Sequence, residues 1–288
     1  MNASTTEVVA EGLAFGEGPR WHDGALWFSD IHALWVKRFD PTTGAVEEIV
    51  HVPGRPSGLG WDGDGNLVIV SMHDRRLLRW DGGAPDDLTE IADLSSYTPY
   101  PINDMVVSER GHAYIGGFGF DFDHGAAPEP TVVLRVDTTT GTHEVAADNA
   151  AFPNGMAITA DGGTLIVGES MAARLTAFTI GDDGTLSDRR EWAALRPAFP
   201  DGICLDAEGC VWVASPGTRE CIRVREGGDV VERVSTGDRL AIACALGGDD
   251  RRTLFLCTAL GLDPKKAVEL RTARIETVRV DVAGAGRP

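Results

Sequence analysis

The stretch Trp61-Asp-Gly-Asp-Gly-Asn-Leu-Val-Ile-Val-Ser71 decides the fold class of this chain. An Asp-Gly turn is followed by a β-branched apolar run, and this combination is the strongest short-range signal of a β-hairpin. The same unit recurs along the chain, beginning at Trp21, Val107, Ile158, Leu205 and Ala245. The chain is therefore built from six copies of one hairpin unit.

Further strands follow each hairpin. A third strand is predicted in each unit, as in Arg76–Trp80, and a fourth is predicted at Val46–Val50, Leu88–Ile91, Thr142–Ala146 and Val230–Val234. Four strands recurring every roughly 40 to 50 residues are typical of a β-propeller blade. Six copies predict an all-β, six-bladed β-propeller with four-stranded antiparallel blades around a central channel.

The ends of the repeat array complete the prediction. Ile275–Val282 is expected to supply a late strand for the last blade, and Glu7–Phe15 the strand that closes the ring and removes an open edge. A short helix is expected near Pro264–Thr272. No Pro- or Ser-rich linker divides the chain, so we expect residues 1–288 to form a single propeller domain.

Charge and cysteine usage limit the partners. The formal net charge is −18 over 288 residues, which argues against nucleic acid and against anionic membrane surfaces. Met1–Val9 has neither a basic nor an apolar run, so no signal peptide is predicted, and no stretch is long enough for a membrane helix. Five cysteines without CxxC spacing are expected to be buried thiols in a reducing cytoplasm. We expect a small-molecule substrate, and leave the oligomeric state open.

One position is polar in most repeats. Four residues before each unit, at the start of the strand that lines the channel, the chain has Glu17, Ser57, Asn103, Asn154, Asp201 and Ala241. Asn and Asp before Gly often form turns, but four such oxygen side chains in register across six repeats favour a site. We therefore expect Glu17, Asn103, Asn154 and Asp201 to be metal ligands. Oxygen donors suit Ca²⁺ best, with Mg²⁺, Mn²⁺ or Zn²⁺ as alternatives.

Chain direction places several loops on the same face as this ring. They include the loops after each second strand and the segments that lead into the next blade. The substrate-binding candidates are Asn103 together with His73, Tyr100, Phe118 and Glu169, and His32 could orient the substrate. The longest loop, 117–130, is either a lid or substrate wall, or an excursion that packs between blades.

Several motifs resemble the regucalcin/gluconolactonase family, which includes senescence marker protein and luciferin-regenerating-enzyme-like proteins. They are Glu17-Gly-Pro-Arg-Trp21, Leu26-Trp-Phe-Ser-Asp30, Pro153-Asn-Gly-Met156, Phe199-Pro-Asp-Gly-Ile203 and Val211-Trp-Val-Ala214. The resemblance implies a six-bladed propeller that holds one divalent ion through Glu17, Asn154 and Asp201. It also implies that Asn103, in the Asn103-Asp104 pair, contacts ion-bound water or substrate. Members that open sugar lactones are expected to have an Arg where this chain has Pro101.

These observations favour a divalent-metal-dependent hydrolase that opens a lactone or related ester less polar than gluconolactone. Asp201 is the candidate catalytic base, because a carboxylate at the metal can take a proton from water. One alternative is a phosphotriesterase resembling diisopropylfluorophosphatase, and another is a non-catalytic Ca²⁺-binding propeller. An isomerisation or cyclisation on the same site also stays open.

Overall fold

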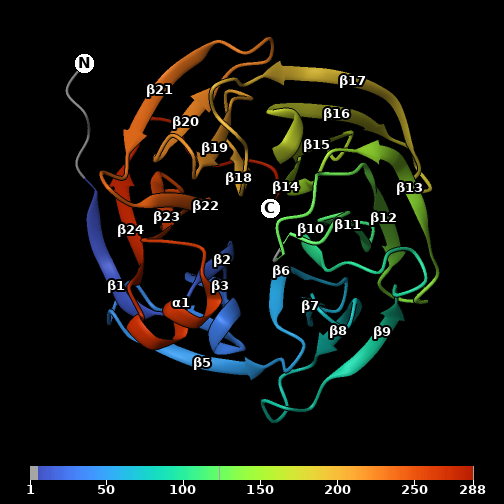
Figure 1. Cartoon of the computed structure of the whole chain (residues 1–288), viewed down its shortest axis with the longest axis horizontal. Coiled ribbons are helices and arrows are strands. Elements are labelled where there is room, and N and C mark those ends of the chain that lie inside the picture. The colour runs from blue at the N-terminus through green and yellow to red at the C-terminus, as the bar shows by residue number, and fades with distance from the viewer. Residues whose placement is uncertain (1–5, 123, 288) are drawn as a thin grey trace.

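The protein is a ring of six four-stranded antiparallel sheets, or blades, around a central channel (Figure 1). The computed structural model describes residues 6–122 and 124–287, so part of the Met1–Val9 segment lies outside it. In five blades the strands follow chain order outward from the channel, and in the sixth the outermost strand comes from the N-terminal part of the chain. This arrangement confirms the six-bladed propeller predicted from the repeats.

The strand bounds follow the repeat closely. Blade 1 contains β2 (Gly16–His22), β3 (Ala25–Asp30), β4 (Trp35–Phe39) and β5 (Val46–His51). Blade 2 contains β6 (Pro56–Trp61), β7 (Leu67–Ser71), β8 (Arg76–Trp80) and β9 (Thr89–Asp93). Blade 3 contains β10 (Ile102–Val107), β11 (His112–Gly117), β12 (Thr131–Asp137) and β13 (His143–Ala150).

The second half of the chain repeats this plan. Blade 4 contains β14 (Pro153–Ile158), β15 (Thr164–Glu169), β16 (Arg174–Ile180) and β17 (Leu186–Ala194). Blade 5 contains β18 (Ile203–Leu205), β19 (Val211–Ser215), β20 (Glu220–Val224) and β21 (Val230–Ser235). Blade 6 contains β22 (Leu240–Gly247), β23 (Thr253–Ala259), β24 (Ala273–Arg279) and β1 (Glu7–Leu13).

Helical segments are short. The single-turn 3₁₀ helices η1 (Ile31–Ala33) and η2 (Ser170–Ala172) follow the second strands of blades 1 and 4. The predicted helix near Pro264–Thr272 is α1 (Pro264–Leu270), whose first backbone N–H groups are capped by the Asp263 carboxylate. Among the described residues, no helix has the length and apolar character that crossing a membrane requires.

Packing between blades explains which strands can be recognised from the sequence. Every residue of β7 is buried, because both faces of a blade pack against its neighbours. The outer strands face solvent. In β17, the residues from Ser187 to Glu191 are exposed and polar, so this strand has no apolar run, and the sequence pattern does not indicate it. The five cysteines are buried and free, as predicted.

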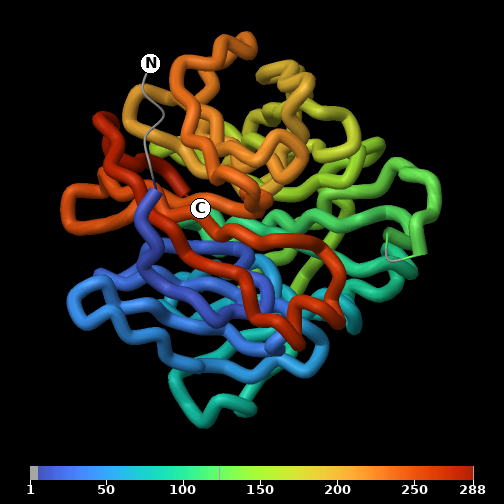
Figure 2. The backbone as a smooth tube through the Cα atoms, turned by 60° about the vertical axis from the view of Figure 1, so that its left-hand side comes forward, coloured from blue at the N-terminus to red at the C-terminus, as the bar shows by residue number. Residues whose placement is uncertain are grey.

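The two ends of the chain meet in blade 6. The N-terminal strand β1 pairs antiparallel with β24, from Glu7 opposite Thr277 to Leu13 opposite Ala273. Figure 2 shows the first and last parts of the chain running side by side there. The expected closing strand is therefore confirmed, and blade 6 is completed by residues from both ends.

The C-terminal segment crosses the end of the channel opposite the polar ring. Backbone hydrogen bonds join Arg287 to Ile158 in both directions, and Ala285 N–H donates to Leu205 O. The segment therefore ties blades 4 and 5 together near the channel axis (Figure 1). The repeats do not predict this covering, because the segment belongs to no blade.

Candidate functional site

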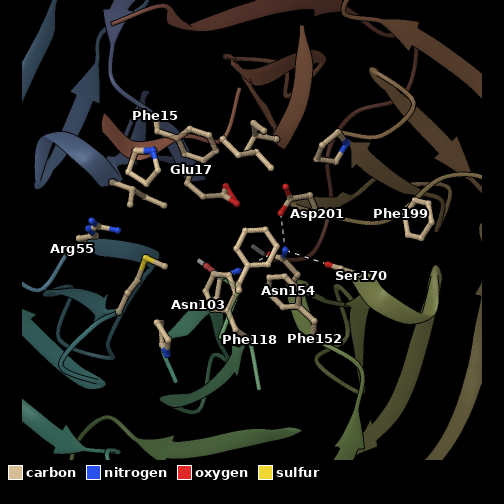
Figure 3. Close-up of a pocket in the computed structure, with 18 of the residues that line it drawn as sticks. Phe15, Glu17, Arg55, Asn103, Phe118, Phe152, Asn154, Ser170, Phe199 and Asp201 are labelled. Carbon is tan, nitrogen blue, oxygen red and sulfur yellow. Dashed lines mark hydrogen bonds between the residues drawn. The ribbon is translucent and has the colours of Figure 1, made fainter. Parts of the chain in front are cut away.

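The side chains of the predicted ring meet at one end of the channel (Figure 3). The Ser57 hydroxyl donates to Asn103 Oδ1 at 3.1 Å, and Asn103 Nδ2 donates to Asn154 Oδ1 at 2.9 Å. Asn154 Nδ2 in turn donates to Asp201 Oδ1 at 2.7 Å. This run of bonds crosses from blade 2 to blade 5, and Glu17 faces it from blade 1.

Irregular pairing in the inner strands aims these side chains at the axis. The ladder between each first and second strand is interrupted beside the ring position in β2, β6, β10, β14 and β22. Such β-bulges redirect a side chain and are common next to active sites. The ring residues therefore lie where the inner strand turns away from regular pairing.

Glycines allow the inner strands to approach one another below the ring. A Cβ atom on Gly155 would lie 2.4 Å from Asp201 O, and one on Gly58 would lie 2.3 Å from Met105 N. Gly18 has a φ of 54°, and a Cβ atom on it would lie 2.7 Å from Ser57 O. A larger residue at these positions would push neighbouring blades apart and separate the ring side chains.

The two ring carboxyl groups are electrostatically strained. Burial raises the pKa of Glu17 well above its usual range, and repulsion from Asp201 and Asp104 adds to this. Burial also raises the pKa of Asp201 to about 8, opposed by the hydrogen bond from Asn154. The Glu17 carboxylate accepts a hydrogen bond at 2.8 Å from the backbone N–H of Gly18, the next residue in the chain. The site therefore favours a positive charge between the carboxylates.

The donor set is that of a hard cation. Within the described residues, no cluster of three or more His, Cys, Asp or Glu side chains has metal-binding geometry. The ring instead combines two carboxylates with two carboxamides, Asn103 and Asn154. Oxygen donors of this kind fit Ca²⁺ or Mg²⁺, and the absence of His and Cys from the ring disfavours Zn²⁺.

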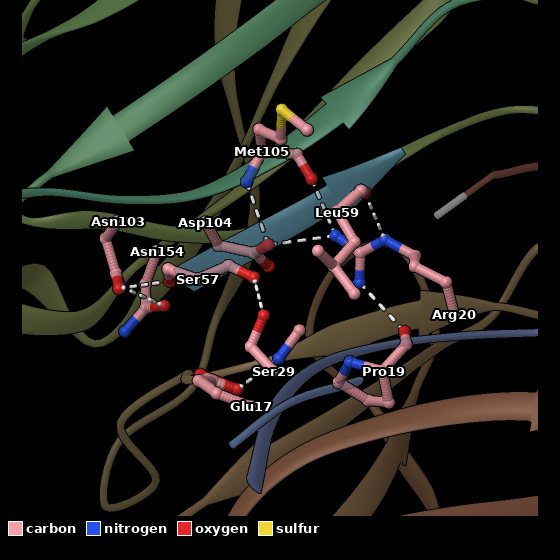
Figure 4. Close-up of polar contacts among 11 residues, drawn as sticks. Glu17, Pro19, Arg20, Ser29, Ser57, Leu59, Asn103, Asp104, Met105 and Asn154 are labelled. Atoms are coloured by element: carbon pink, nitrogen blue, oxygen red, sulfur yellow. Dashed lines mark hydrogen bonds and ion pairs between the residues drawn. The ribbon is translucent and has the colours of Figure 1, made fainter. Parts of the chain in front are cut away.

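A buried ion pair lies beside the ring (Figure 4). It was not predicted from the sequence. Arg20 Nη2 donates to Asp104 Oδ1 at 2.9 Å, and both side chains are buried. The same guanidinium also donates to Leu59 O at 3.1 Å and Met105 O at 2.6 Å. Arg20 thus joins blades 1, 2 and 3. Its position within the motif Glu17-Gly-Pro-Arg-Trp21, three residues after Glu17, was the available signal.

The ring forms the floor of a cavity of about 330 Å³. Its walls are mostly apolar, with aromatic, methionine, proline and aliphatic side chains from all six blades and from the segment that leads into α1. The lining residues include Phe15, Ile31, Met72, Pro101, Phe118, Phe122, Phe152, Met171, Phe199, Pro200, Ile242 and Leu262. Such a cavity, with a few convergent polar groups, has the character of a small-molecule site.

Loop 117–130 contributes one of these walls. Phe118 and Phe122 line the cavity, and the ring centroids of Phe118 and Phe152 are 4.5 Å apart. Phe120 is buried behind them, 6.1 Å from Phe152. The loop is therefore both a cavity wall and part of an aromatic cluster with blade 4.

The structure separates the other candidate residues into two groups. His32 and His73 line the cavity. Tyr100 and Glu169 do not, although both were expected near the substrate. The Glu169 carboxylate is buried, where it accepts hydrogen bonds from Arg174 and Arg189 and from Ala151 N–H. Through these hydrogen bonds Glu169 joins neighbouring strands of blade 4.

A family model of the SMP-30/gluconolactonase/LRE-like region matches residues 15–260. The chain belongs to this family. Two curated relatives of this gluconolactonase-family protein are named as lactonases. Pentonolactonase XacC of Haloferax volcanii is 28% identical, over 99% of this chain and 97% of the relative. The 6-deoxy-6-sulfogluconolactonase of Pseudomonas putida is 25% identical, over 100% and 99%.

A solved structure shares the fold of this gluconolactonase-family chain. It is described as the calcium-binding protein regucalcin from Agrobacterium tumefaciens. The TM-score is 0.82, with 20% identity over 99% of this chain and 97% of the other.

Proposed function

We propose that this protein is a divalent-cation-dependent hydrolase that opens a lactone or related ester. The observation that carries the proposal is that Glu17 faces the hydrogen-bonded run of Asn103, Asn154 and Asp201 at the floor of an apolar cavity. The family membership and the two lactonase relatives support the reaction class.

Glu17, Asn154 and Asp201 would hold the cation, with Asn103 beside them. The raised pKa values of the two carboxyl groups support this assignment, because a cation offsets their burial and their repulsion. Ca²⁺ is our first choice since all donors are oxygen atoms. When bound, such an ion polarises an ester carbonyl and lowers the pKa of water.

Asp201 is proposed as the base. It takes a proton from water as the water oxygen attacks the lactone carbonyl carbon, and it returns that proton to the ring oxygen when the C–O bond breaks. The product is a hydroxy acid. The Asn154 amide holds one Asp201 oxygen at 2.7 Å, so the carboxylate has a fixed orientation. Asn103, which is bonded to Asn154, positions that amide.

The cavity walls favour a substrate less polar than gluconolactone. Sugar hydroxyl groups buried against Phe118, Phe122 and Phe152 would lose hydrogen bonds to water without replacement. Pro101, which lines the cavity, has no donor at all to offer a hydroxyl group. Alkyl or aryl substituents on the lactone ring would instead gain from burial there.

The cavity and the cysteines indicate a binding partner and a cellular compartment. A small molecule is the proposed partner because the site is a cavity of about 330 Å³ with mostly apolar walls. The buried free thiols favour a reducing compartment, so we propose the cytoplasm.

The test is an activity screen over γ- and δ-lactones of graded polarity, with Ca²⁺, with EDTA, and with the cation restored. We expect apolar lactones to be opened faster than gluconolactone, and activity to vanish in EDTA and return with the cation. A paraoxon-type substrate runs in parallel. Faster turnover of the phosphotriester would assign the site to that chemistry, and no turnover of any ester at saturating cation would leave a non-catalytic binding propeller.

A further inference from the structure

A second layer of equivalent residues surrounds the cavity above the oxygen ring. Two residues before each ring position the chain has Phe15, Arg55, Pro101, Phe152, Phe199 and Arg239. The first five of these line the cavity. Arg239 is turned away and buried, where its guanidinium donates to Thr258 Oγ1 at 2.8 Å and pairs with Glu276 at 3.3 Å. Arg55 is therefore the charged residue among the five members of this layer that line the cavity.

The backbone at Arg55 is held from both sides. Arg55 N–H donates to Val52 O at 3.0 Å, and Met72 N–H donates to Arg55 O at 2.9 Å. Its φ of 71° is shared by other arginines of the chain, such as Arg219 with 56°. Position in the cavity, and not backbone conformation, distinguishes Arg55.

The Arg55 charge has no counterpart in the described structure. Among the described residues that line the cavity, it is the only Lys or Arg, and its hydrogen bonds within the described structure are those of its backbone. The exposed carboxylate of Asp121 also lines the cavity, but it contacts the His124 ring at 2.8 Å within its own loop. The two ring carboxylates would be neutralised by a cation. A half-buried guanidinium in an apolar wall then favours a carboxylate, which it can bind through two parallel N–H bonds.

We propose that the lactone opened here carries a carboxylate group that binds Arg55. The apolar substituent of the lactone lies against Phe118 and Phe152, whose side chains Figure 3 shows well apart from that of Arg55. The substrate class is thus an alkyl- or aryl-substituted lactone acid. This inference rests on the proposed lactone hydrolysis, and it assigns Arg55 as the residue that selects the substrate by charge.

The test uses a matched pair of phenyl-substituted γ-lactones, one with a ring carboxylate and one with the carboxamide of the same size. The full-length, Ca²⁺-loaded protein is expected to have a kcat/KM at least about tenfold higher for the carboxylate. Arg55→Gly, whose glycine accepts the positive φ, should reduce this ratio at least about tenfold, mainly through KM. Arg55→Lys should retain part of the preference. Arg219→Gly is the control, because Arg219 is exposed, has a similar φ and lies outside the cavity lining.

A binding arm separates this inference from the hydrolysis itself. The probe is the cyclic ether analogue of the carboxylate lactone, which cannot be opened, and calorimetry measures its Kd. Arg55→Gly should weaken binding at least about tenfold, and Arg219→Gly should not. If the wild type binds and opens both members of the pair equally, the Arg55 inference is overturned while lactone hydrolysis stands. If no lactone is opened but the ether binds through Arg55, hydrolysis fails and the anion site stands.

Discussion

The side-chain amide of Asn154 donates a 2.7 Å hydrogen bond to Asp201 Oδ1 and so joins blades 4 and 5 at the channel axis. The same amide nitrogen lies 3.2 Å from Ser170 Oγ, which donates to Pro200 O. The Asn154 amide is thus held by Asp201 and Ser170. It sets the direction in which the Asp201 carboxylate faces. The proposed base is oriented by the blade beside it and not by its own strand.

Replacing Asp201 by Asn tests the base. We expect kcat/KM for an apolar lactone to fall at least about 100-fold, since general base catalysis contributes this much, and Ca²⁺ affinity to fall as well. Steady-state kinetics and calorimetry provide the two measurements. Asp182→Asn removes an exposed carboxylate and serves as the control. Unchanged turnover and unchanged Ca²⁺ affinity in Asp201→Asn would remove Asp201 from the mechanism.

The stability of the cation-free protein should fall as pH rises from about 5 to about 8. In the folded state the pKa of Asp201 is about 8 and that of Glu17 is also raised, whereas both groups ionise near pH 4 when unfolded. The folded state therefore binds more protons in this window, and the slope for each group is at most about 1.4 kcal/mol per pH unit. Calorimetric Tm values in EDTA measure it.

Two controls accompany the pH series. Ca²⁺ should raise Tm more at pH 8 than at pH 5, because binding requires both carboxylates deprotonated. Asp201→Asn should flatten the fall in EDTA. A Tm in EDTA that stays constant or rises over this range would show that the two carboxyl groups are not strained.

Replacing Arg20 by Met should destabilise the protein by about 3–5 kcal/mol, because Asp104 would remain buried without its partner. Denaturant unfolding provides the measurement. The double replacement Arg20→Met with Asp104→Asn should recover part of the loss. If the single variant were as stable as the wild type, the ion pair would not hold blades 1 and 3 together.

Replacing Phe118 by Ala should raise KM for a phenyl-substituted lactone by about 10- to 100-fold, because about 1.5–3 kcal/mol of aromatic burial is lost. KM for the unsubstituted lactone should change much less, and the comparison of the two substrates is the measurement. Val145→Ala, on the exposed face of an outer strand, is the control. Equal effects on both substrates would place the apolar substituent elsewhere.

The sequence predicted the fold well because each blade repeats one hairpin whose turn contains a glycine with positive φ. The Asp-Gly hairpins and the apolar middle strands can be recognised from short stretches of sequence. The number of their repeats gives the number of blades. The position of Glu17, Asn103, Asn154 and Asp201 at one end of the channel followed from the same register. Strand β17 was not predicted because an outer strand that faces solvent needs no apolar run.

Side-chain contacts between strands, whether within one blade or between blades, could not be predicted in this way. Glu169 occupies a loop-proximal position, as a substrate-binding residue would, yet Arg174 and Arg189 reach it from neighbouring strands. The partners of Arg20 lie 39 and 84 residues away, at Leu59 and Asp104. Pairings over such distances depend on how blades pack, and a repeat pattern describes only each blade in isolation.

The pairing of β1 with β24 has a consequence for how the protein is made. A ribosome produces Glu7–Leu13 first and its partner Ala273–Arg279 last, roughly 15 to 50 seconds later at ordinary synthesis rates. Throughout that interval the first strand has no partner, and many nascent chains on one messenger carry the same unpaired segment. Glu7 and Glu11 place like charges on it, which hinders neighbouring nascent chains from pairing with each other before their own last blade emerges.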